Sequence, residues 1–212
     1  MDASLKSIME KRVEKAIKAL RANRMEAEFV ESKEKLLEMI KGMVPQNAVV
    51  CSGGSMTLNQ TGVYDLLMDG PYDFYYRGRT DENGEAIDVM RKAFFADWYF
   101  ASSNAVTLNG ELYNVDGNAN RVAAITYGPK NVAVIIGWNK LVKDLDEAEA
   151  RVKAFAAPSN VARLNCETGC KTTGYCINCQ MPGRICCTTV IHGFQRAEGR
   201  IKVFILPENF GF

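Results

Sequence analysis

Residues 25–68, MEAEFVESKEKLLEMIKGMVPQNAVVCSGGSMTLNQTGVYDLLM, decide the fold class. The first five alternate apolar and acidic side chains, as in a half-buried strand, and Ser32 is placed to cap a helix with apolar residues at helical spacing. Residues 48–51 are an apolar run without alternation, typical of a strand covered on both faces. The turn at 53–54 leads to a third helical segment over 58–68. This strand–helix–strand–helix order predicts an α/β fold with a mostly parallel sheet flanked by helices.

The rest of the chain extends the same pattern. An apolar stripe predicts an N-terminal helix over residues 1–22, and Asn109-Gly110 is a strong signal for a β-hairpin turn. Further expected elements are a strand at 74–76, a helix at 85–96, hairpin strands at 105–108 and 111–115, a helix at 121–127, a strand at 132–136, a helix at 146–155 and strands at 188–191 and 201–206. Because the sequence has no repeat, low-complexity tract or clear linker, we expect a single domain over residues 1–212.

Composition argues against several classes of protein. The net charge is +1 and neither half is strongly basic, which argues against binding to nucleic acid or to anionic lipid. The longest apolar runs, such as residues 132–138, are far too short to cross a bilayer. The N-terminus is charged and lacks the apolar core of a signal peptide, so the expected location is the cytoplasm.

A glycine loop joins the buried strand at 48–51 to the helix that follows. Gly53 and Gly54 allow the backbone to come close to a ligand, and Ser55 and Thr57 add hydroxyl groups. The N-terminus of the next helix offers backbone N–H groups to an anion. Ligands of open α/β sheets bind at the carboxyl ends of the strands, which is where this loop lies. A tight turn between a strand and a helix can contain the same glycines without binding a ligand, so the loop alone is only a weak sign of a ligand site.

A second polar stretch runs from residue 102 to 121, SSNAVTLNGELYNVDGNANR. Its hydrogen-bonding side chains include Asn104, Glu111, Asn114, Asp116, Asn118, Asn120 and Arg121. Glu111 is the best placed of these to act as acid, base or nucleophile, with Asn104 and Asp116 as further catalytic candidates. Asn120 is expected to cap the next helix, and Arg121 to bind a ligand with it. We expect Glu111, Asn104 and Asp116 to share one cleft with Ser55.

Six of the seven cysteines fall in a segment at residues 165–187 that lacks any periodicity: Cys166, Cys170, Cys176, Cys179, Cys186 and Cys187. In a reducing compartment such a cluster more often binds metal than forms disulfides. Zinc ribbons separate their cysteine pairs by roughly 15–20 residues, so the short spacing here favours an iron–sulfur cluster, with zinc or free redox-active thiols as alternatives. Neighbours on a strand point to opposite faces, so at most one of Cys186 and Cys187 is a ligand. We expect one metal centre whose ligands are Cys166, Cys170, Cys176 and Cys179, with Cys186 as the alternate ligand.

At these motifs the chain resembles the LUD-domain family, which includes the lactate-utilisation protein C subunit. The resemblance is strongest at GGSMTLNQTGVYDLL (53–67), over 102–158, and in the cysteine segment ending GRIC (183–186). It implies a fold similar to that of ribose-5-phosphate isomerase, glucosamine-phosphate deaminase and the CoA transferases. In those proteins, loops at the carboxyl ends of the strands hold phosphorylated sugars or CoA thioesters.

The resemblance also implies roles for individual residues. Gly53, Gly54 and Ser55 match the ligand-side glycine loop, and the family's polar signature is matched by Asn104, Glu111, Asp116, Gly117, Asn120 and Arg121. Ala119 departs from the pattern, because a glycine is expected there. A cysteine pattern found in part of the family is matched by Cys166, Cys170, Cys176, Cys179 and Cys186.

The implied function is a component of lactate or organic-acid oxidation that carries an iron–sulfur cluster, favoured as [4Fe–4S], and works with iron–sulfur partner subunits. One alternative is a stand-alone enzyme acting on a sugar phosphate or an acyl-CoA. Another is an anion-binding module with structural zinc. In each case the expected ligand is a small anion, namely a carboxylate, a phosphosugar or a CoA ester. A homo-oligomer is compatible with all three.

Overall fold

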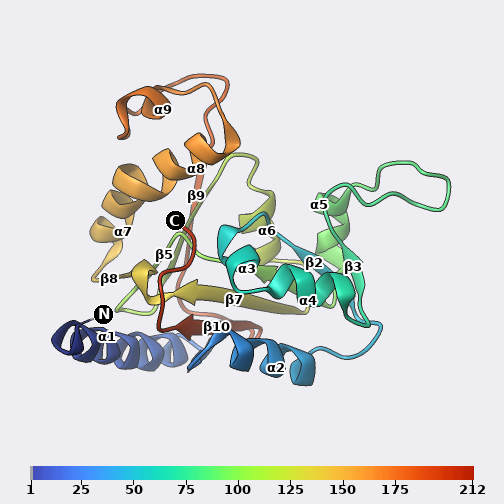
Figure 1. The fold of residues 1–212 in the computed structure, drawn as a ribbon, viewed down its shortest axis with the longest axis horizontal. Coiled ribbons are helices and arrows are strands. Elements are labelled where there is room, and N and C mark those ends of the chain that lie inside the picture. Colours follow the sequence, from blue (N-terminus) through green and yellow to red (C-terminus); the bar gives the residue numbers. More distant parts are fainter. Residues whose placement is uncertain (1) are drawn as a thin grey trace.

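The computed structural model describes residues 2–212, and its centre is a six-stranded parallel sheet in the order β1-β10-β7-β4-β2-β3. The strands are β1 Glu26–Phe29, β2 Val49–Ser52, β3 Asp73–Tyr75, β4 Trp98–Ala101, β7 Asn131–Gly137 and β10 Ile201–Leu206. A smaller sheet has the order β8-β5-β6-β9, with β5 Ala105–Thr107, β6 Leu112–Asp116, β8 Leu141–Val142 and β9 Thr188–His192. The expected mostly parallel α/β fold is confirmed (Figure 1).

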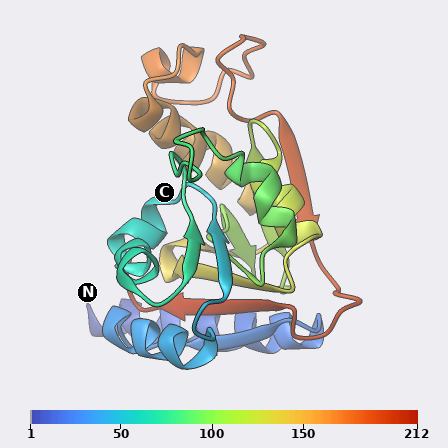
Figure 2. The ribbon, with the colours of Figure 1, turned by 90° about the vertical axis from the view of Figure 1, so that its right-hand side faces the viewer.

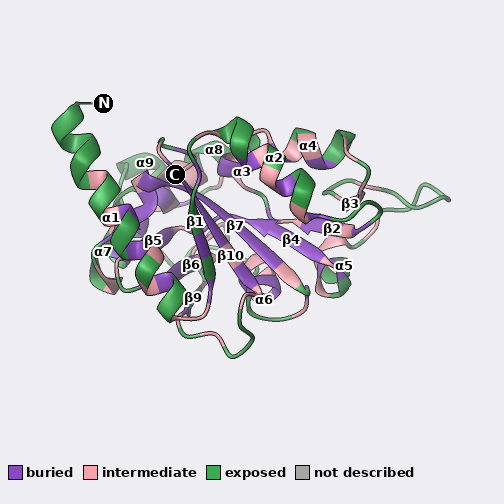
Figure 3. Cartoon of the chain, turned by 90° about the horizontal axis from the view of Figure 1, so that it is seen from below, coloured by how far each residue is buried: buried purple, intermediate pink, exposed green. Residues whose placement is uncertain are grey.

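Helices cover both faces of the parallel sheet (Figures 1 and 3). They are α1 Ala3–Ala22, α2 Lys33–Met43, α3 Met56–Gln60, α4 Val63–Asp69, α5 Val89–Lys92, α6 Asn120–Thr126, α7 Leu145–Arg151, α8 Ala157–Leu164 and α9 Gly169–Thr173. A π-helical turn, Val152–Ala156, connects α7 to α8. No helix within residues 2–212 is long and apolar enough to cross a membrane.

The two faces of the sheet have separate cores, because side chains alternate along each strand. On β7, Val132, Val134 and Ile136 pack with α1, α6 and the small sheet. The residues between them, Ala133 and Ile135, pack with α2, α3 and α4. The far face of the small sheet packs against α7. Figure 2 shows that α8 and the cysteine segment lie at the opposite end of the molecule from α1.

Several elements differ from their sequence-based expectation. The single helix expected over 58–68 is two helices, since Gly62 adopts a left-handed φ of 75° between α3 and α4. The helix expected over 85–96 begins only at Val89, because Ala86 pairs with Thr80 in a β-bridge. The helix expected over 146–155 continues through the π-turn into α8.

The largest omission is β4, Trp98–Ala101, for which no strand was expected. All four of its residues are buried, and it pairs with both β2 and β7 in the middle of the sheet. Its three aromatic residues and one alanine have no period-2 alternation, and no Gly or Pro separates them from the apolar end of the helix expected over 85–96, so the start of the strand is not marked. The omission bears directly on the site, because Ser102 and Ser103 follow β4.

Candidate functional site

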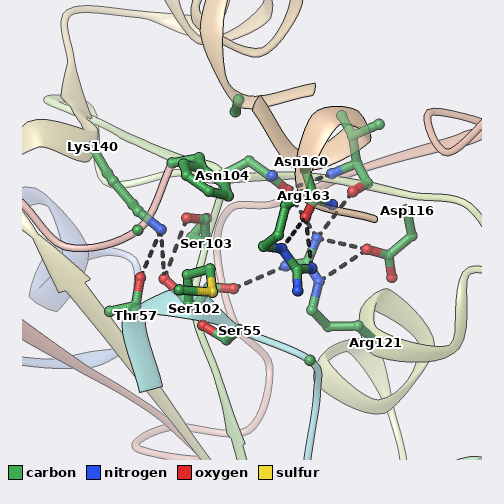
Figure 4. A pocket seen from close by; sticks show the side chains of 16 residues that line it. Ser55, Thr57, Ser102, Ser103, Asn104, Asp116, Arg121, Lys140, Asn160 and Arg163 are labelled. Atoms are coloured by element: carbon green, nitrogen blue, oxygen red, sulfur yellow. Dashed lines mark hydrogen bonds and ion pairs between the residues drawn. The ribbon is translucent and has the colours of Figure 1, made fainter. Parts of the chain in front are cut away.

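A polar cavity of about 140 Å³ lies at the carboxyl ends of β2, β4 and β7. We call it the strand-end cavity. Its polar side chains come from the glycine loop and the start of α3, from the segments after β4 and β7, from the end of β6, from α6 and from α8. They are Ser55, Thr57, Ser102, Ser103, Asn104, Asp116, Arg121, Lys140, Asn160 and Arg163 (Figure 4). Parallel strands bring segments that are distant in sequence to one sheet edge, which is the usual ligand site of this fold class.

Lys140 is the most unusual side chain of the strand-end cavity. It is only 4% exposed, and its Nζ lies 3.0 Å from Thr57 Oγ1 and 2.9 Å from Ser102 Oγ. Burial, reinforced by the nearby positive charges of Arg151 and Arg121, lowers the pKa of Lys140 well below its ordinary value. A buried amine that is held by two hydroxyls and no carboxylate is a candidate functional group.

Arg121 lies at the centre of a hydrogen-bond network that we call the Arg121 network. Its guanidinium donates to Asp116 Oδ1 (2.9 Å from Nε), Asn114 Oδ1 (2.5 Å) and Asn104 Oδ1 (2.8 Å). It also donates to the carbonyl oxygens of Ser102 and Val115. The other carboxylate oxygen of Asp116 accepts from the backbone N–H of Val122, in the first turn of α6.

The Arg121 network therefore has a structural task. Its members tie the end of β4 to the end of β6 and to the start of α6. Arg121, Asp116 and Asn104 line the strand-end cavity, as expected from the sequence, but the hydrogen-bonding capacity of the guanidinium is already used inside the protein. We conclude that these residues shape the cavity.

The charge around the strand-end cavity is positive. Asp116 is the one carboxylate side chain among the described lining residues, and Arg121 neutralises it at 2.6 Å. Arg163, on α8, is exposed and donates only to Asn160 Oδ1 among residues 2–212. Arg151 lies behind Lys140 and donates to the carbonyl oxygens of Asn104 and Asn139. This arrangement favours an anionic ligand.

The glycine loop separates the strand-end cavity from a second one of about 260 Å³, which we call the tyrosine cavity. Gly54 lines both, whereas Gly53 and Asn120 line only the tyrosine cavity, with Tyr64, Tyr76, Arg77 and Tyr99 among its other walls. The ligand-binding residues expected from the sequence are thus divided between two cavities. A side chain at position 53 would come within 3.0 Å of Tyr99 Oη, which accounts for the glycine there.

Glu111 lies outside the strand-end cavity, so the expectation that it shares one cleft with Ser55 was wrong. It follows the hairpin turn at Gly110, whose Cα packs against the backbone of Ala19 in α1. Asp116, at the other end of β6, lines the cavity, so the extended strand separates the two by roughly 16 Å. The carboxylate of Glu111 accepts from Thr107 Oγ1 at 2.7 Å within the turn. Glu111 therefore has no contact with the strand-end cavity.

Ala119 occupies the N-cap position of α6, where the sequence analysis placed Asn120. Its φ of 58° lies in the left-handed region, which disfavours any residue with a Cβ. This explains why a glycine is expected at this position in related sequences. Asn120 is instead the first residue of the helix.

Ala119→Gly is expected to raise the free energy of unfolding by about 0.5–1 kcal/mol, because removal of the left-handed strain outweighs the added flexibility of the unfolded chain. Urea denaturation measures the change. Ala162→Gly, at an exposed position inside α8, is the control and should lower stability by about 1 kcal/mol. Equal losses in both variants would contradict the assigned backbone conformation.

The cysteines lie in a separate region. Cys170, Cys176, Cys179 and Cys186 line one small cavity of about 10 Å³, which we call the thiol cavity, together with Ile177 and Arg184 among others. Cys166 lies outside it, at the end of α8, where its N–H donates to the carbonyl oxygen of Val161. All seven cysteines are free thiols. Within residues 2–212, no three Cys, His, Asp or Glu side chains are arranged closely enough to hold a metal ion.

The donor set of the thiol cavity nevertheless suits a soft metal. Four cysteines line one space, and Arg184 donates to the carbonyl oxygens of Cys179 and Cys186, which places its positive charge beside them. Thiolate ligands at Zn²⁺ or iron would gain from such a charge. The cavity as it stands has room for about one water-sized particle, so a cluster requires the loop to open.

Sequence reasoning missed Lys140, Ser102, Ser103, Asn160 and Arg163 as members of the site. Lys140 follows the buried strand β7 directly after Gly137-Trp138-Asn139, so a polar residue at the carboxyl end of a predicted parallel strand was an available signal. For Arg163 and Asn160 the sequence offered no such signal, since the helix α8 that carries them was not expected. Their position depends on how α8 packs over the strand ends.

A family model and one solved structure of similar length agree with this fold. Residues 13–206 match the LUD domain. A DUF162 family protein from Deinococcus radiodurans, solved at 1.70 Å resolution, is 13% identical and superposes with a TM-score of 0.51 over 96% of this chain and 98% of that one. Ribose 5-phosphate isomerase from Plasmodium falciparum is 16% identical and covers 52% of each chain, at a TM-score of only 0.33. No curated protein matches the sequence. Since the LUD domain spans most of the chain, the protein belongs to the LUD domain family.

Proposed function

We propose that the protein binds a small organic acid in the strand-end cavity, as a component of lactate or organic-acid oxidation. One observation carries the proposal: the described lining residues supply three basic side chains and one carboxylate side chain, which is already neutralised. Membership in the LUD domain family supports the link to organic acids.

The charges and the size of the cavity favour a small carboxylate. The charges of Arg121 and Asp116 cancel in their ion pair, so Lys140 and Arg163 are the basic groups left to face an anion. An anion beside Lys140 favours the protonated amine, so binding is expected to take up a proton. A volume of about 140 Å³ is below the roughly 300–1,000 Å³ of pockets that enclose drug-sized ligands, so any larger group must extend outside.

Arg163→Gln is expected to weaken the binding of lactate or pyruvate about tenfold. A hydrogen bond from a charged donor to a carboxylate contributes roughly 1.5 kcal/mol, and about 1.4 kcal/mol corresponds to a factor of ten. Isothermal titration calorimetry at low salt measures the dissociation constant. In two buffers of different ionisation enthalpy, it also measures the expected proton uptake.

The matched control is Arg196→Gln. Arg196 is exposed in the loop between β9 and β10, where the neighbouring Gln195 N–H donates to Asn23 O beside the end of α1. This variant should bind like the unchanged protein. Lactamide, which lacks the negative charge, should bind much more weakly than lactate. The proposal fails if lactamide binds equally well, or if both arginine variants behave alike.

We further propose that the cysteine segment holds a metal centre, with an iron–sulfur cluster preferred to zinc. Cys170, Cys176, Cys179 and Cys186 are the ligands that the thiol cavity favours, whereas the set expected from the sequence has Cys166 in place of Cys186. When bound, an iron–sulfur cluster would supply one-electron transfer. Iron–sulfur partner subunits would then receive the electrons from organic-acid oxidation.

A further inference from the structure

The hydrogen bonds around Lys140 show which of its two hydroxyl partners, Thr57 or Ser102, can donate a proton to its amine. Thr57 Oγ1 donates to the carbonyl oxygen of Phe210 at 3.3 Å, so it accepts from Lys140 Nζ at 3.0 Å. Ser102 Oγ lies 2.9 Å from the same Nζ, and its one other hydrogen bond within residues 2–212 is a long one of 3.5 Å to Ser103 O. The hydroxyl proton of Ser102 is therefore free to point at the lone pair of a neutral amine.

The surroundings keep this amine without a counter-ion. The charged groups around it are Arg151 from α7, the Arg121–Asp116 pair from α6 and β6, and Arg163 from α8 across the cavity. No carboxylate within residues 2–212 forms an ion pair with Lys140, and burial holds its pKa well below the usual value. A deprotonated lysine is a competent general base.

Thr57, Lys140 and Ser102 thus reproduce the general pattern of an activated nucleophile. A nucleophile lies within hydrogen-bond distance of a base, and a third group orients the base. Ser102 also has the right position: it follows β4 at the carboxyl edge of the sheet and lines the strand-end cavity. Ser103 does not compete for the role, because its Oγ donates to Ala105 O at 2.7 Å and also contacts Tyr113 O.

We propose that Ser102 is a catalytic nucleophile and Lys140 its general base, and that together they transfer a short acyl group from an ester or thioester to water. The cavity has space for a small acyl group, and the remainder of the substrate would lie outside it. The inference rests on the proposed function only in placing an organic acid in the same cavity, where it would be the product.

Each step balances without an oxidant or reductant. The Ser102 hydroxyl gives its proton to Lys140 as its oxygen attacks the carbonyl carbon, and the acyl–sulfur or acyl–oxygen bond then breaks. The leaving thiol or alcohol takes the proton from Lys140. In the second half, Lys140 accepts a proton from water as the water oxygen attacks the acyl-serine carbonyl. The bond between the acyl carbon and Ser102 Oγ then breaks, Lys140 returns the proton to Ser102 Oγ, and the carboxylic acid leaves.

The test uses the full chain and p-nitrophenyl acetate. We expect an initial release of p-nitrophenolate, one acetyl group per chain by intact-protein mass spectrometry, and its location on Ser102 by peptide mapping. Ser102→Ala should abolish the adduct and lower the rate at least about a hundredfold. Ser159→Ala, on α8 outside the cavity lining, should change neither.

Two further measurements separate this inference from acid binding. Lys140→Arg keeps a positive charge but cannot act as a base at neutral pH, so it should lose the acylation of Ser102. The acylation rate of the unchanged protein should rise with pH as Lys140 loses its proton, at a lower pH than an ordinary lysine would require. An acetyl group on Lys140, equal labelling of Ser102→Ala, or no adduct at all would overturn the inference. If the unchanged protein forms the acyl adduct on Ser102 but does not bind lactate, the result would instead count against the proposed function.

Discussion

Arg121→Gln is expected to lower the free energy of unfolding by about 3–5 kcal/mol, the typical cost of leaving one partner of a buried ion pair alone. The side chains of Arg121 and Asp116 are only 13% and 10% exposed. Glutamine cannot replace the guanidinium, which reaches Asp116, Asn104, Asn114 and two backbone carbonyls at once. Because domains of this size are marginally stable, the loss is a large part of the total. Urea denaturation followed by circular dichroism measures it.

Two further variants serve as controls for this prediction. Arg121→Lys should recover little stability, since an ammonium group has no planar fork to serve several acceptors. Lys130→Gln removes a basic residue from an exposed pair with Asp97, so its effect should be much smaller. A loss for Arg121→Gln no larger than that for Lys130→Gln would show that the Arg121 network does not hold the strand ends together.

The sequence predicted those helices and strands that have a clear local pattern of their own. The alternation at the start of β1, the Ser32 cap of α2 and the unbroken apolar run of β2 each point to one element, and the structure has all three. Ser32 Oγ accepts from Lys35 N, as a cap should. The central strand β4 was missed because it follows the apolar end of an expected helix with no Gly or Pro between them, so no turn signal marks where the strand begins.

The site was predictable only in part, for a related reason. Asn104, Asp116 and Arg121 lie in one polar stretch and were recognised together, although their hydrogen bonds show them to be structural. Glu111 belongs to the same stretch but lies at the wrong end of a hairpin. Ser102 and Lys140 are 38 residues apart and meet because β4 and β7 are neighbours in the sheet. A sequence pattern does not contain that strand order.

Cys170→Ser and Cys179→Ser are each expected to remove nearly all bound metal from protein purified without oxygen, and to abolish any visible absorbance of an iron–sulfur cluster. Both thiols line the thiol cavity, and the loss of one of four thiolate ligands leaves a soft metal centre incomplete. Both variants should also be cleaved faster by protease within residues 165–187. Apart from the short helix α9, this segment has little regular structure, so a metal would contribute much of its order.

The choice of ligands can be decided by three controls. Cys187 is exposed and lies outside the thiol cavity, and Cys51 is buried in the main core, where burial raises the pKa of its thiol to about 12. Cys187→Ser and Cys51→Ser should therefore keep their metal. Cys166→Ser separates two ligand sets: retained metal favours the four thiols of the cavity, and lost metal favours the set expected from spacing. Iron and zinc analysis distinguishes the two metals. If the unchanged protein contains neither metal after anaerobic purification and all its accessible thiols titrate as free, the segment is not a metal site.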